Sequence, residues 1–230
     1  MSSNYEIYPN QPLVEVSCQI NFPFILAIQN ESHLIQKEFS DYPLVLCGKR
    51  IGNAFIDEYR LEDITRTFGI AFAGDKIAFY AKKYPGHEEF IGRFIKAVKV
   101  FADRYELNNI VELTWNYVNL IPFHKKDGVI PFSEIFNISL NVPGDITNNM
   151  KNILFYFDTP FENGTISTRL EFVIDNANKE YILLDNEYAF NKEIKYDELE
   201  ESARKAREIT RELFEKYITK NYKEYLRGNK

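Results

Sequence analysis

The chain has 230 residues, a formal net charge of −6 and 45% hydrophobic residues. A chain of this size can bury a core without a metal or a disulfide, and its composition excludes disorder over most of its length. No apolar run approaches the roughly 18 residues of a membrane-spanning helix, and the acidic charge argues against nucleic acid as the default partner. With only Cys18 and Cys47 and no stretch resembling a secretory signal, we expect a cytoplasmic protein with free thiols.

The first predicted element is a strand at Leu13–Asn21, where apolar and polar residues alternate with a period of two. We expect a helix around Ala27–Phe39 and then two weak strands, near Leu44–Cys47 and Arg50–Ile56. These segments indicate a mixture of helix and sheet from the start of the chain.

A β-hairpin is predicted at Arg66–Ala73 and Lys76–Lys82, because Gly74-Asp75 provides the permissive backbone that such a turn requires. A long helix is expected at about His87–Tyr105, directly after a Pro-Gly break. Its aromatic residues recur with helical spacing and form one apolar face. We expect that face to lie on a sheet.

The segment Ile110–Val118 repeats the first strand at a constant offset of 97 positions (112 minus 15), with Glu15 aligned to Glu112 and Ser17 to Thr114. The polar residues therefore match as well as the apolar ones. A generic amphipathic strand would not repeat both, so we interpret the two segments as duplicated strands.

The second half is predicted to follow the order of the first. It has a short helix at Ser133–Ile138, with Ser133 as the expected N-cap. Strands follow at Asn152–Asp158, Thr165–Ile174 and Glu180–Tyr188, and a last helix is expected at about Asp197–Leu226. Acidic residues in the first turns of that helix and basic residues in its last turns complement the helix dipole.

The predicted fold is therefore α+β, with two pseudo-repeated halves that each contain a strand, a short helix, several strands and a long helix. The halves comprise residues 1–107 and 108–230 of one compact unit. They are expected to share one antiparallel sheet with both long helices on one face. This layout resembles the saddle of the TATA-box-binding proteins, a resemblance that predicts architecture only, since fold does not determine function.

Four short strings together resemble a sporadically distributed family of uncharacterised bacterial and archaeal proteins. In chain order they are Gln11-Pro12-Leu13-Val14-Glu15-Val16 with Ile20 and Phe22, Tyr84-Pro85-Gly86 with Glu88-Glu89-Phe90, Asn116-Tyr117-Val118-Asn119-Leu120-Ile121-Pro122, and Leu213-Phe214-Glu215 leading to Ile218-Thr219-Lys220. The resemblance implies no established activity, and the patchy distribution suggests a mobile-element or defence-associated gene. The family often has a His where this chain has Arg207, so a role of that His would not transfer.

No catalytic constellation is present in the sequence. The three histidines, His33, His87 and His124, lie far apart, and each is interpreted as a solvated surface residue. Motifs of zinc proteases, thiol pairs, serine hydrolases, phosphate loops and dinucleotide sites are absent. We therefore expect no cofactor and no metal, and an enzyme is not favoured.

The first candidate site is the polar side of the duplicated strands, lined by Glu15, Ser17, Gln19, Glu112, Thr114 and Asn116. If the strands are neighbours, Glu15 and Glu112 could approach each other and share a proton or a cation, as in a metal-dependent hydrolase. The alternative is that both simply face solvent on the wet side of the sheet. Because this surface is polar but not basic, it suits a peptide or protein better than nucleic acid.

The second candidate site is a group of basic residues on and before the first long helix: Lys82, Lys83, Arg93, Lys96, Lys99 and Arg104. It is interpreted either as a nucleic-acid-binding stripe or as the solvated face of an amphipathic helix. The leading hypothesis is a non-enzymatic binding or regulatory module that engages a protein partner through its sheet face or a strand edge, with a homodimer left open. The alternative is a nucleic-acid-associated protein of a mobile-element or defence system.

Overall fold

The computed structural model describes residues 8–47, 58–139 and 151–228. The strands are β1 (Leu13–Asn21), β2 (Leu44–Cys47), β3 (Tyr59–Glu62), β4 (Phe68–Ala73), β5 (Lys76–Ala81), β6 (Asn109–Ile110), β7 (Glu112–Pro122), β8 (Leu154–Phe161), β9 (Gly164–Ile174), β10 (Glu180–Phe190) and β11 (Ile194–Lys195). The helices are α1 (Leu26–Asn30), α2 (Ser32–Glu38), α3 (His87–Tyr105), α4 (Phe132–Ile135), α6 (Leu199–Tyr217) and α7 (Lys220–Leu226), with a 3₁₀ turn, η1, at Tyr196–Glu198. The strand expected at Arg50–Ile56 lies outside the described residues.

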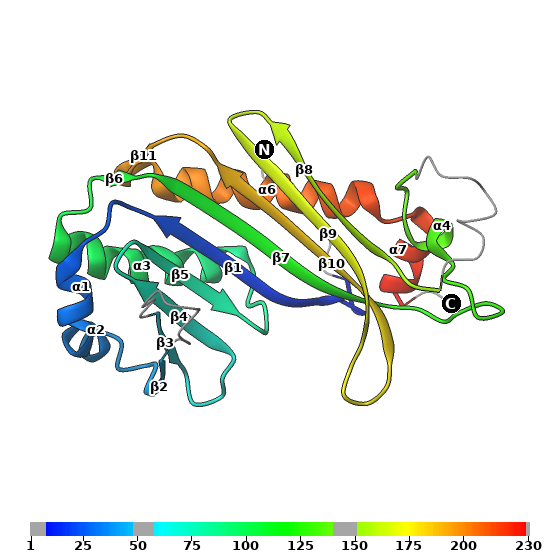
Figure 1. Ribbon diagram of the computed structural model, residues 1–230, viewed down its shortest axis with the longest axis horizontal. Coiled ribbons are helices and arrows are strands. Elements are labelled where there is room, and N and C mark those ends of the chain that lie inside the picture. The colour runs from blue at the N-terminus through cyan, green and yellow to red at the C-terminus, as the bar shows by residue number, and fades with distance from the viewer. Residues whose placement is uncertain (1–7, 48–57, 140–150, 229–230) are drawn as a thin grey trace.

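Nine strands form one antiparallel sheet in the order β2-β3-β4-β5-β1-β7-β10-β9-β8. The two long helices, α3 and α6, lie on the same side of it, behind the strands in the view of Figure 1. The predicted mixture of helices with a large antiparallel sheet is confirmed. No helix in the described ranges is long and apolar enough to cross a membrane.

The core lies between the sheet and the two long helices. Alternation along β1 and β7 sends every second side chain toward the helices, and Trp115 at the centre of β7 is fully buried, with its ring centroid 5.1 Å from that of Phe90. From α3, Phe90, Phe94 and Phe101 are all inaccessible to solvent. Each such ring stabilises the fold by roughly 1.5–3 kcal/mol relative to an exposed one. The aromatic face predicted for this helix does lie on the sheet.

Two of the predicted helices, Ala27–Phe39 and Asp197–Leu226, are wrong in one respect, because each is broken into two. The first divides at Glu31 into α1 and α2. The last ends at Tyr217, because Ile218 adopts an extended conformation and pairs with Phe136 in a β-bridge. Thr219 then starts α7, since its side chain accepts a hydrogen bond of 3.2 Å from the backbone N–H of Tyr222.

Two local predictions also need correction. The short fourth helix begins at Phe132 and has Pro131 at its N-cap with no side-chain cap, so Ser133 does not cap it. The β4–β5 turn falls where it was predicted, but the backbone of Gly74 is not in the left-handed region. The ring of Phe24 lies close over Gly74, so a Cβ atom there would lie 2.5 Å from it and would displace this exposed ring.

Candidate functional site on the open face of the sheet

The side of the sheet opposite α3 and α6, which we call the open face, carries the polar residues of the central strands. All six residues of the first predicted site project to it, since they alternate with the buried residues of β1 and β7. It is lined at the centre by Glu15, Ser17, Gln19, Asn21, Glu112, Thr114, Asn116, Asp185 and Glu187. Most of these side chains are half-buried between their cross-strand neighbours.

The two glutamates of the predicted pair do not meet. In the β1–β7 register, Glu15 lies opposite Val118, whereas Glu112 lies opposite Asn21. The two carboxylates are therefore separated by six residues along the sheet, which corresponds to roughly 20 Å at about 3.4 Å per residue. They cannot share a proton or a cation, and the hypothesis of a metal-dependent hydrolase at this pair is wrong.

Strand β10 supplies the acidic residues that do gather beside β7. Asp185 lies opposite Val118 and Glu187 lies opposite Asn116. The Asn116 side-chain N–H donates a hydrogen bond of 2.8 Å to Oδ1 of Asp185. Sequence reasoning missed both acids: alternation in the predicted strand places them on a polar face, but nothing in the sequence says which strand lies next to them.

Partial burial raises the pKa of three carboxyl groups on the open face. For Glu15 burial is the main cause, Lys82 and Arg60 oppose it, and Asp185 reinforces it. Burial is also the main cause of the raised pKa of Asp185 and Glu187, where the Asn116 hydrogen bond acts in the opposite direction. Each carboxylate is thus more costly to ionise in the folded protein than in water.

The basic residues of the open face are engaged with other acids. Glu58 forms ion pairs with Arg60 at 2.8 Å and with Lys76 at 2.5 Å, and Lys82 pairs with Glu62 at 3.2 Å. Arg169 likewise pairs with Glu171. Within the described ranges, no ion pair engages the three raised carboxyl groups. The centre of the face is therefore acidic, and the nearby cations Lys82, Arg60 and Arg169 act on Glu15 and Asp185 without forming ion pairs with them.

Beside this acidic centre, a tyrosine covers a glycine on the neighbouring strand. The ring of Tyr80 lies over Gly69, and its hydroxyl donates a hydrogen bond of 2.8 Å to Glu62, which is 4% exposed. Ala71 and Ala78 continue the small buried apolar patch next to the ring. On this half of the open face, a tyrosine ring and small side chains therefore pack closely together.

The basic residues of the second predicted site are divided between two faces. Lys82 pairs with Glu62 on the open face, whereas α3 lies behind the sheet (Figure 1). On α3 itself, three cations are paired with acids: Arg93 with Glu89 at 2.7 Å, Lys99 with Asp103 at 2.9 Å and Arg104 with Glu31 at 2.9 Å. These pairs lower the net positive charge that a nucleic-acid stripe would need.

All three histidines are exposed, as the sequence indicated, and His87 Nε2 lies 3.1 Å from a carboxylate oxygen of Glu88. Across residues 8–47, 58–139 and 151–228, no three His, Cys, Asp or Glu side chains are grouped so as to hold a metal ion.

Two of the strings that carry the family resemblance meet behind the sheet, together with Arg207. The hydroxyls of Tyr84 and Tyr117 lie 3.4 Å apart, and Arg207 hydrogen-bonds to both. Burial raises the pKa of both tyrosines. The cluster ties the loop before α3 to β7 and α6, which is a structural role for residues that sequence reasoning could not connect.

Comparison with known proteins adds no identification. A scan against models of protein families matches none of them, and a search of curated proteins finds no similar sequence.

Proposed function

We propose that this protein is a non-enzymatic binding module whose open face holds a cationic segment of a protein partner. One observation carries the proposal: Glu15, Asp185 and Glu187 are half-buried, have raised pKa values and lack an ion-pair partner among the described residues. A buried carboxylate without a partner is costly. Lysine or arginine side chains from a partner would offset that cost.

The spacing of the acids favours an extended segment. Asp185 and Glu187 are two residues apart on one strand, so their side chains project to the same face about 7 Å apart. A partner in the extended conformation repeats at the same interval. Basic residues at alternate positions of such a segment would meet both acids at once.

The proposal includes the finer architecture expected from the sequence, a duplicated unit with the saddle layout of the TATA-box-binding proteins. The support is the sheet register, because it pairs Cys18 with Trp115, which are themselves 97 positions apart (115 minus 18). A twofold axis through this pair would relate the two halves. Membership of the sporadically distributed family remains part of the proposal and rests on the sequence strings alone.

The test is calorimetric titration of the protein with a synthetic peptide of alternating Lys and Thr. The double variant Asp185→Asn/Glu187→Gln keeps the shape of the face and removes its two charges. The matched control Glu201→Gln/Glu208→Gln removes two exposed charges from α6. We expect salt-dependent binding that weakens at least tenfold in the face variant and is unchanged in the control. Equal loss in both variants, or no loss in the face variant, would contradict the proposal.

Parallel measurements test the other predicted partners, which are nucleic acid and a second copy of the chain. Saturable binding of a mixed-sequence oligonucleotide that is lost in Lys96→Gln/Lys99→Gln would replace the peptide proposal by the nucleic-acid alternative. Sedimentation of the protein alone tests the homodimer. The exposed edge strand β8, with Leu154 67% and Tyr156 64% exposed, is the edge at which a second copy could pair.

A further inference from the structure

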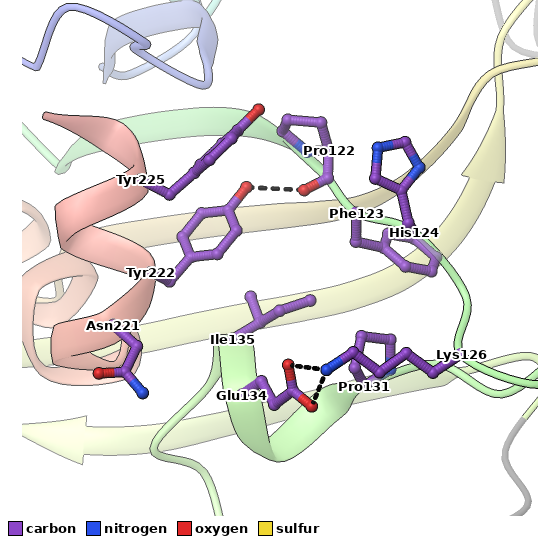
Figure 2. A pocket seen from close by; sticks show the side chains of 10 residues that line it. All are labelled: Pro122, Phe123, His124, Lys126, Pro131, Glu134, Ile135, Asn221, Tyr222 and Tyr225. Atoms are coloured by element: carbon purple, nitrogen blue, oxygen red, sulfur yellow. Dashed lines mark hydrogen bonds and ion pairs between the residues drawn. The ribbon is translucent and has the colours of Figure 1, made fainter. Parts of the chain in front are cut away.

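A pocket of about 450 Å³ lies away from the open face, where the β7 end meets α4 and α7 (Figure 2). It is lined by Pro122, Phe123, His124, Lys126, Pro131, Glu134, Ile135, Asn221, Tyr222 and Tyr225. Its volume is within the range of sites that bind small ligands or a few residues of a peptide.

Helix α7, which follows the break at Ile218, supplies one wall of this pocket. Tyr222 and Tyr225 are one turn apart on α7, the helix that Thr219 caps, and both project toward Pro122 and Phe123 (Figure 2). Their ring centroids are 5.3 Å apart. Proline, phenylalanine and tyrosine make up five of the ten lining residues.

The charges at the rim cancel each other. Lys126 Nζ lies 2.7 and 2.8 Å from the two carboxylate oxygens of Glu134, and Lys125 pairs with Glu180 at 2.7 Å nearby. The hydroxyl of Tyr222 is also engaged, since it donates a hydrogen bond of 2.8 Å to the carbonyl of Pro122. An ionic ligand would have to compete with these contacts.

The polar groups that remain can all donate hydrogen bonds. They are the side-chain amide of Asn221, the hydroxyl of Tyr225 and the ring of His124, none of which has a hydrogen bond or ion pair within the described part of the chain. An uncharged ligand with an apolar surface and several carbonyl acceptors matches this combination. A proline-rich segment has those properties, because proline has no backbone N–H and the polyproline II helix leaves its carbonyls free.

We propose that this pocket docks a proline-rich segment of a partner protein in the polyproline II conformation. Aromatic-lined grooves recognise such segments because they are already extended before binding and lose little entropy. The site is separate from the acidic centre of the open face. The test of this docking site is therefore independent of the test of the proposed function.

The test is titration of the ¹⁵N-labelled protein with acetylated, amidated hexaproline, followed by amide chemical shifts. Tyr225→Ala and Asn221→Ala alter exposed residues of the pocket, and Tyr156→Ala is the matched control, an exposed tyrosine on β8. We expect saturable binding with shifts confined to the pocket. It should weaken at least tenfold in Tyr225→Ala, about fivefold in Asn221→Ala, and stay unchanged in Tyr156→Ala.

A Gly-Ser hexapeptide and the small aromatic molecule indole serve as comparison probes. The proposal requires that the Gly-Ser peptide, which has carbonyls but neither the ring surface nor the stiff backbone, does not saturate the site. Absence of saturable hexaproline binding overturns the proposal, as does equal binding in Tyr225→Ala. Saturation by indole without hexaproline binding also overturns it and assigns the pocket to small molecules.

Discussion

The substitution Gly69→Ala tests the packing of the open face. Although the change is small, the structure predicts that it lowers the stability of the folded protein strongly. A Cβ atom at this position would lie 2.2 Å from Cζ of Tyr80, a distance that the folded protein cannot accommodate. The ring must move away from the strand. Its hydroxyl would then lose the hydrogen bond of 2.8 Å to the carboxylate of Glu62, which stays buried.

The expected cost follows from these contacts. A hydrogen bond to a charged group contributes roughly 1.5–3 kcal/mol, and displacing a packed ring costs about 1–3 kcal/mol more. Alanine also restricts the conformations of the unfolded chain, which stabilises the folded state by roughly 0.4–1 kcal/mol. The net loss should be about 3 kcal/mol, which for a chain of this length lowers Tm by roughly 6–12 °C.

Urea unfolding followed by the fluorescence of Trp115 measures this loss, since it is the single tryptophan and is fully buried. The control is the same substitution in a Tyr80→Ala background, where the obstructing ring is absent. There Gly69→Ala should be neutral or stabilise by about 0.5 kcal/mol. An equal cost in both backgrounds, or no cost in the native sequence, would refute the packing argument.

Three further outcomes are expected. Because burial raises the folded pKa values of Asp185 and Glu187, the stability they contribute is complete below their unfolded pKa values and is lost as the pH rises through the folded ones. Asp185→Asn/Glu187→Gln should therefore raise Tm at pH 7 but not at pH 3, and an equal gain at both would count against the burial. Cys18 is fully buried with a raised pKa, so a thiol reagent should modify it only on unfolding; rapid modification of the native protein would show that it is accessible. Thr219→Ala should cost about 1 kcal/mol in urea unfolding and Thr219→Ser far less, because the hydroxyl caps α7; equal costs would exclude the cap.

Elements with a strong local period were predictable from the sequence. The alternation in Leu13–Asn21 and the helical aromatic spacing in His87–Tyr105 defined β1 and α3 with their observed bounds. Strand β3 was missed because two of its four residues are charged and its extended conformation depends on pairing with β2 and β4. The helix breaks were also missed. The break after α6 depends on the β-bridge between Ile218 and Phe136, a contact between residues distant in sequence.

The same distinction between local and long-range information applies to the candidate site. By itself the sequence determined which side of each strand is polar, because side chains alternate along any strand whatever lies beside it. Only the tertiary structure decided which polar residues meet, since strand order and register depend on hydrogen bonds between distant segments. That register separated Glu15 from Glu112 and placed Asp185 and Glu187 beside Asn116.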